Sequence, residues 1–69
     1  MREWKREGYE VVEKEFDGDL HEFDVIAGGE IIATITPNDI EDMEEIIKDL
    51  DNGEDVNGWE DGMGNTISI

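Results

Sequence analysis

Alternation of apolar and polar residues predicts three extended segments in the first half of the chain. The segment 8–16 (GYEVVEKEF) is rich in strand-forming residues, and 20–27 (LHEFDVIA) and 30–35 (EIIATI) continue the pattern. The pairs 17–18 (DG) and 28–29 (GG) separate them, and such pairs favour two-residue hairpin turns because both central positions need positive φ. We therefore predict a three-stranded antiparallel meander.

Two tight turns also predict a strand register. A turn centred on 17–18 places Val12 opposite Phe23, and a turn at the second glycine pair places Val25 opposite Ile32. In this register both sheet faces are apolar, whereas a single helix covers only one of them. The other face would be covered by the two tryptophans folding back or by a second copy in a homodimer. A β-bulge in either hairpin would shift the register.

The segment 36–53 has the periodicity of one amphipathic helix. Thr36 is a suitable N-cap and Pro37 a suitable first helical residue, and 52–53 (NG) is a common helix end. One face carries the charged residues, and the other carries an apolar stripe suited to a core. The stripe comprises Ile40, Met43, Ile46, Ile47 and Leu50.

The two ends of the chain are less regular. Residues 1–7 are interpreted as a frayed lead-in or as a short edge segment that docks Trp4 on the core. The Gly-rich stretch 53–65 is expected to be a loop anchored by Val56 and Trp59, and 66–69 (TISI) is expected to form a short final strand. The predicted fold is thus a single α+β domain, 1–69, with the order β-β-β-α-β.

Charge narrows the range of functions. The chain has 21 acidic and 5 basic side chains, a net charge of −16. Residues 1–14 are balanced, so residues 15–69 carry the whole excess. Such a field excludes nucleic acid and anionic membranes as direct ligands and favours basic partners. A merely solvated acidic surface, adaptation to high salt and intrinsic disorder are the alternatives, although the regular apolar periodicity favours a folded chain.

The sequence offers little for catalysis. It contains one histidine, His21, one serine, Ser68, and no cysteine, so a nucleophile–base–orienting group arrangement is not expected. Paired carboxylates carry little information among 21 acids. We therefore expect no enzymatic activity and no cofactor. Without an apolar run long enough to span a membrane or a secretory signal, we expect a cytoplasmic protein, in the host cell's cytoplasm if a phage encodes it.

The acidic run 49–62 resembles a calcium-binding loop only in its abundance of carboxylates. An EF-hand loop needs oxygen ligands at positions 1, 3 and 5, Gly at 6 and Glu at 12. No starting residue satisfies this pattern: beginning at Asp49, for example, puts Gly53 at position 5 and Glu54 at position 6. We expect weak, nonspecific cation binding and no dedicated metal site. The glycines of this stretch lack an accompanying cation, which excludes a phosphate loop.

Regularly spaced carboxylates are the strongest candidate feature. Glu41, Glu45 and Asp49 recur at i, i+4 and i+8 on one helix face, with neighbours about 5–6 Å apart. Alternate strand residues such as Glu22 and Asp24 lie about 6.5–7 Å apart. Solubility alone would need fewer charges. The predicted partner-binding residues are Glu41, Asp42, Glu45, Asp49, Glu54, Asp55, Glu60 and Asp61, with Trp59 as an apolar anchor or a plain core residue.

These features predict a small inhibitor that acts by occupancy. It would mimic DNA or RNA and fill the basic groove of a nucleic-acid-binding protein, and it resembles in charge and size the short acidic proteins encoded by phages and mobile elements, such as anti-restriction or anti-CRISPR proteins. The alternative is a dimeric adaptor or antitoxin-like protein that neutralises a basic partner through its apolar sheet face.

Overall fold

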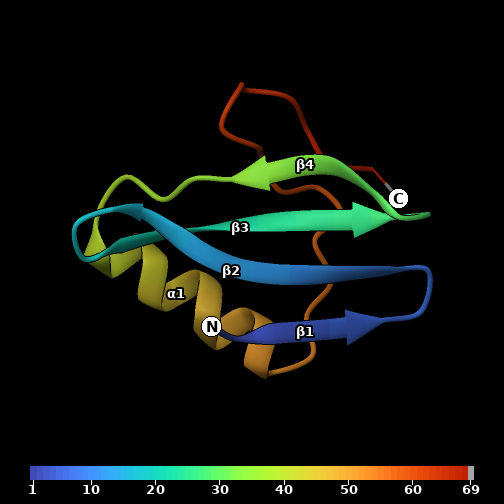
Figure 1. The fold of residues 1–69 in the computed structure, drawn as a ribbon, viewed down its shortest axis with the longest axis horizontal. Coiled ribbons are helices and arrows are strands. Elements are labelled where there is room, and N and C mark those ends of the chain that lie inside the picture. The colour runs from blue at the N-terminus through green and yellow to red at the C-terminus, as the bar shows by residue number, and fades with distance from the viewer. Residues whose placement is uncertain (69) are drawn as a thin grey trace.

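The computed structural model describes residues 1–68 and contains one antiparallel sheet and one helix (Figure 1). The four strands lie in the order β1-β2-β3-β4, so each pairs with its neighbours in sequence. The α+β class is confirmed, but the sheet has one more strand before the helix than the sequence predicted. The elements are β1 (Glu3–Arg6), β2 (Tyr9–Asp17), β3 (Leu20–Ala27), β4 (Glu30–Ile35) and α1 (Ile40–Asp51).

The first segment of the chain is an edge strand rather than a frayed lead-in. Trp4 of β1 lies opposite Val11 of β2, and the Glu13 amide donates to the Arg2 carbonyl at 2.9 Å. The Trp4 side chain is only 7% exposed, because its indole packs on the core. Of the two interpretations of residues 1–7, the edge segment that docks Trp4 is therefore the correct one.

The predicted register between β2 and β3 is wrong by one residue. Val11 lies opposite Val25 and Glu13 opposite Phe23, and the register shifts again between Glu15 and Asp17. The extra residue in this bulge is Phe16. The bulge lengthens β2 and moves the turn to 18–19. Because side chains alternate along a strand, the one-residue shift places Val11, and not Val12, on the same sheet face as Phe23.

The second hairpin has the predicted turn and a second bulge. Gly28 and Gly29 both have positive φ, 62° and 80°, and Ile26 lies opposite Ile31 as predicted. Beyond this pair Val25 lies opposite Ala33 and not Ile32, so the predicted Val25–Ile32 pair is wrong. Ile32 is the extra residue of this bulge.

The two sheet faces differ in character. One face builds the core with residues from all four strands, the helix and the C-terminal segment. On the other face, Lys14 forms ion pairs with Glu22 at 3.3 Å and Asp24 at 3.0 Å. The second sheet face, predicted to be apolar, is therefore interrupted by a charged cluster, and the homodimer stays a prediction. The buried apolar residues are Trp4, Val11, Phe23, Val25, Ile35, Leu50, Val56 and Ile67.

The helix begins later than predicted. Asp39 is the N-cap, and its Oδ1 accepts a hydrogen bond from the Asp42 amide at 2.8 Å, so Thr36 and Pro37 precede the helix. An Asp three residues before a free amide satisfies that donor directly, which explains the later start. The predicted end is confirmed: Gly53 has φ 86° and its amide donates to the Leu50 carbonyl.

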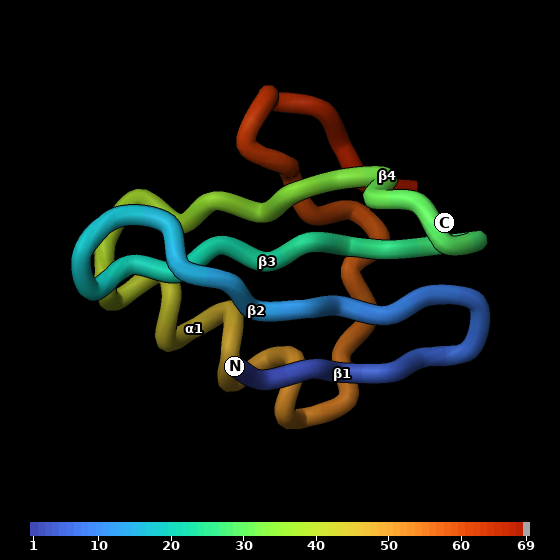
Figure 2. Tube along the Cα trace, viewed as in Figure 1, coloured from blue at the N-terminus to red at the C-terminus, as the bar shows by residue number. Residues whose placement is uncertain are grey.

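After α1 the chain crosses the core face of the sheet from the β1 side to the β4 side (Figures 1 and 2). The Glu54 carbonyl accepts from Arg6, the Val56 amide donates to the Tyr9 hydroxyl at 3.3 Å, and the Gly62 amide donates to the Thr34 carbonyl at 2.9 Å. The predicted loop is confirmed, because no helix or strand follows α1 in the described residues, and Val56 is fully buried as its predicted anchor.

The predicted final strand does not join the sheet. Thr66 forms an isolated bridge with Glu60, so residues 59–67 fold back on themselves. The Ile67 side chain is buried, and its backbone exchanges hydrogen bonds with Gly58 and Trp59. A short apolar segment can thus be anchored by burial without a place in the sheet. Ile69, the last residue of the predicted strand, lies outside the described residues.

Candidate acidic groove

A groove of about 580 Å³ lies between α1 and the C-terminal loop, beside the end of β4. The helix forms one wall and the segment 59–64 forms the other, while the β4–α1 connection forms one end. Its lining residues are Ile35, Thr36, Pro37, Asn38, Asp42, Glu45, Ile46, Asp49, Trp59, Glu60, Asp61, Gly62 and Gly64.

The groove brings together most of the predicted partner-binding residues. Five of the eight acids line it, three from the helix and two from the loop, and Trp59 lines it as well. Glu41, Glu54 and Asp55 do not line it. Trp59 is half-buried and packs against the core, while its role as an anchor for a partner stays a prediction. The lining acids are Asp42, Glu45, Asp49, Glu60 and Asp61.

The helix supplies its wall through simple spacing. Asp42, Glu45 and Asp49 stand at i, i+3 and i+7, which places them on one side of α1. Ile46 lies on the same side and packs against the core, so the carboxylates stand at the border between the apolar stripe and solvent. The apolar stripe thereby fixes the direction in which the acidic row faces.

The loop wall is held by backbone hydrogen bonds. The Asp61 amide donates to the Asn65 carbonyl at 2.8 Å, and Asp61 Oδ1 accepts from the amides of Met63 and Asn65 at 2.8 and 2.9 Å. Gly62 allows the loop to approach β4 closely, because a Cβ there would lie 2.8 Å from Thr36 Oγ1. This close approach positions Glu60 and Asp61 across from the helix.

The groove is strongly anionic. No Lys or Arg lines it, and within residues 1–68 the carboxylates of four lining acids accept no hydrogen bond; these are Asp42, Glu45, Asp49 and Glu60. Asp61 uses one oxygen to order the loop. Close carboxylates repel one another, so their arrangement costs folding free energy. A ligand with several positive charges would relieve this repulsion.

Other acids serve the fold instead, a distinction that sequence spacing did not reveal. Glu22 and Asp24, which strand alternation also suggested for the acidic surface, are tied to Lys14. Thr34 Oγ1 donates to Asp24 at 2.9 Å, and Thr36 Oγ1 donates to Glu22 at 3.1 Å. Only the strand register, which the bulges altered, could have indicated these pairings.

Glu13 is the most buried acid and pairs with the histidine. Its Oε2 lies 2.9 Å from His21 Nδ1, and its Oε1 accepts from the Arg2 amide at 3.1 Å. Burial disfavours the Glu13 charge most strongly, but the two hydrogen bonds and the electrostatic attraction of His21 and Arg2 together outweigh it and place the pKa of Glu13 below its usual value. His21 is itself partly exposed, and its ring pairs with this buried carboxylate.

Three further observations concern the chain as a whole. Within residues 1–68, no group of three or more His, Cys, Asp or Glu side chains is arranged to hold a metal ion. No helix in this range is both long and apolar enough to cross a membrane. No protein-family model, curated protein or solved structure matches the chain.

Proposed function

We propose that this protein is an inhibitor that occupies the basic nucleic-acid-binding groove of a target protein by mimicking DNA or RNA. The observation that carries the proposal is the groove in which α1 and the loop present facing carboxylates without any cation. It also includes a half-buried indole, which a purely solvated surface would not need.

Binding would exchange the target's phosphate contacts for carboxylate contacts. Arg and Lys side chains of the target donate to Asp42, Glu45, Asp49 and Glu60, and charge-assisted bonds of this kind are stronger than neutral ones. Trp59 offers its ring face to a guanidinium group. Along the helix the three acids are separated by rises of about 4.5 and 6 Å, so each step covers between one and two phosphates of a strand with a rise of about 3.4 Å per nucleotide.

Capture from a lysate at low salt, with competing duplex DNA, tests this function. A nucleic-acid-binding protein should be recovered, and both DNA and high salt should displace it. The triple variant D42N/E45Q/D49N should lose the target. The matched control is E3Q/E7Q/E15Q, which removes the same charge from exposed acids outside the groove and should retain the target. If both variants lose the target equally, the acidic residues serve only to keep the protein solvated, and the proposed groove contact is wrong.

A second candidate function rests on a different observation. Ile31, Ile32 and Met63 are exposed beside β4, which suits an adaptor or antitoxin-like protein that holds a basic partner through apolar contacts without mimicry. In that case binding would survive high salt and competing DNA. The same capture experiment therefore separates the two functions.

A further inference from the structure

An apolar hollow of about 370 Å³ lies on the outer side of β4, next to the acidic groove. Ile31 is 58% exposed, Ile32 45% and Met63 87%. Together with Ala33 they form its apolar wall, and Glu22 and Asp61 supply the charged part of its lining. Three large apolar side chains left open to water at one place mark an interaction surface.

The exposure of the two isoleucines follows from the β4 bulge. In a regular strand, consecutive side chains point to opposite faces, so one of the pair would enter the core. The extra residue at Ile32 interrupts this alternation, and both Ile31 and Ile32 remain exposed. Bulges commonly redirect side chains near binding sites.

The β4 edge beside this hollow is partly free. β4 is an edge strand of the sheet, and on its free side the Gly62 amide donates a hydrogen bond to the Thr34 carbonyl. Among the described residues, no other segment outside the sheet donates or accepts a backbone hydrogen bond along Glu30–Ile35. An extended segment could therefore lie along the first half of this strand.

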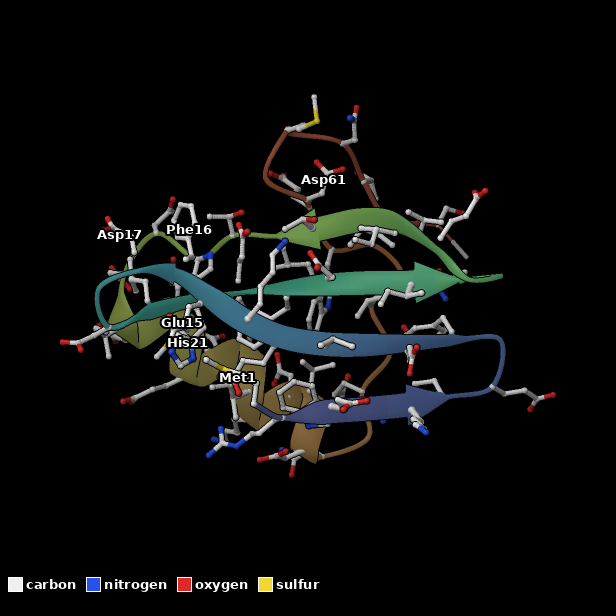
Figure 3. The ribbon with its side chains drawn as sticks, in the orientation of Figure 1. Met1, Glu15, Phe16, Asp17, His21 and Asp61 are labelled. Atoms are coloured by element: carbon white, nitrogen blue, oxygen red, sulfur yellow. The ribbon has the colours of Figure 1, made fainter. Side chains whose placement is uncertain are left out.

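The hollow is continuous with the groove. Thr36, Asp61 and Gly62 line both, so the loop wall of the groove is also a wall of the hollow. Figure 3 shows Asp61 beyond β4, away from the end of β2 that carries Phe16 and Asp17. One extended segment could reach both sites by crossing this shared wall.

Charge identifies the occupant. A second copy would bring its own charge of −16 to a site where Asp61 has no basic partner, Glu22 being paired with Lys14, and the resulting repulsion opposes self-association. A positively charged segment would instead be attracted to the same place. The hollow therefore favours a basic partner over a homodimer.

We propose that the hollow receives an apolar side chain from an extended, basic segment of the partner, whose Lys and Arg side chains lie in the acidic groove. This inference rests on the proposed function, since it concerns the same partner. It adds an apolar anchor, which charge mimicry alone would not provide. The anchor would let the protein discriminate among basic partners of equal charge.

Two synthetic peptides of equal length and charge test the inference, one alternating Lys with Val and the other alternating Lys with Ser. The Lys-Val peptide should bind at least about tenfold more tightly, as expected for one well-buried apolar side chain. The variant I31S/M63S should abolish this difference and leave Lys-Ser binding unchanged. The control F16S removes an apolar residue of similar exposure that does not line the hollow and should preserve the difference.

The groove variant D42N/E45Q/D49N should bind both peptides more weakly, and by the same factor. If the two peptides bind with equal affinity and the groove variant binds neither, the proposed role of the hollow is wrong, while the proposed role of the groove stands. Binding of neither peptide would overturn both proposals. Sedimentation of the protein alone provides a further check, because a dimer that I31S/M63S dissociates would make a second copy the occupant. Unchanged thermal melting of each variant shows that it is folded.

Discussion

The indole Nε1 of Trp4 donates to Asp51 Oδ1 at 2.7 Å, which joins the first strand to the last residue of the helix. The Arg6 Nη2 reinforces this junction by donating to the Leu50 carbonyl at 2.6 Å. A cation at the C-terminus of a helix also stabilises the helix dipole. β1 thus holds the end of α1 as well as one edge of the sheet.

Replacement of Trp4 should therefore be severe. We expect Trp4→Ala to reduce the free energy of unfolding by about 3–5 kcal/mol, because it removes a buried aromatic side chain. Asp51→Ala should cost about 1–2 kcal/mol through loss of the hydrogen bond. Urea-induced unfolding measures both, with the exposed substitution Glu3→Gln as the control. Wild-type stability of both variants would show that β1 is dispensable.

Glu13 should make stability depend on acid pH. Its pKa is lower in the folded state than the usual 4.5, so the folded state binds fewer protons. The stabilisation is therefore present above about pH 4.5 and is lost as the pH falls through the folded-state pKa. We expect Glu13→Gln to destabilise the protein at pH 7, with the difference from wild type shrinking in acid. Glu7→Gln should show no such trend in urea titrations across this range.

Lys14 should have the opposite dependence at alkaline pH. Hydrogen bonds to Asp24 and then Glu22 raise its pKa above 10.5, against a smaller effect of desolvation. Its stabilisation is therefore present below about pH 10.5 and is lost as the pH rises through the folded-state pKa. Lys14→Gln should be less stable than wild type at pH 7, and the gap should narrow at high pH. Lys48→Gln, which removes a cation without these partners, is the control.

Salt should affect folding and binding in opposite directions. Raising NaCl from about 0.01 M to about 1 M shortens the Debye length from roughly 30 to 3 Å and screens the repulsion among surface carboxylates. We expect the melting temperature to rise while affinity for the Lys-Ser peptide falls. The control E3Q/E7Q/E15Q, with fewer charges, should show a smaller rise in melting temperature. A melting temperature that falls with salt would contradict this account.

Gly62 should be essential to the loop wall. In Gly62→Ala the new Cβ would meet Thr36 Oγ1, which is itself bonded to Glu22, so the loop must move away from β4. We expect weaker Lys-Ser peptide binding, altered Trp59 fluorescence and a stability loss of about 1–3 kcal/mol. Met63→Ala, at an exposed neighbouring position, should leave all three unchanged. A Gly62→Ala variant with normal binding would show that the close approach is unnecessary.

Local patterns predicted the elements that depend on neighbours in sequence. The apolar stripe identified α1, and the glycine pair at 28–29 identified the second turn, because both signals lie within a few residues. The acidic groove could be predicted only in part: its helical row follows from periodicity, whereas Glu60 and Asp61 face it because Gly62 fastens the loop to Thr34.

Features that depend on distant contacts could not be predicted in the same way. The bulges at Phe16 and Ile32 carry no local sequence signal comparable to a glycine turn, yet each shifts the pairing by one residue. The final TISI segment has strand-forming residues, but its Ile67 is buried without any sheet partner. Tertiary packing, rather than residue preference, decided these positions.

The order of the strands has a consequence for when the acidic groove forms during folding. Each strand pairs with its predecessor, so the sheet consists of local contacts and is expected to form early and fast. The groove, however, is complete only after the segment 59–64 has docked beside β4. A chain that has formed only the sheet would therefore still lack the acidic groove, which would be completed last.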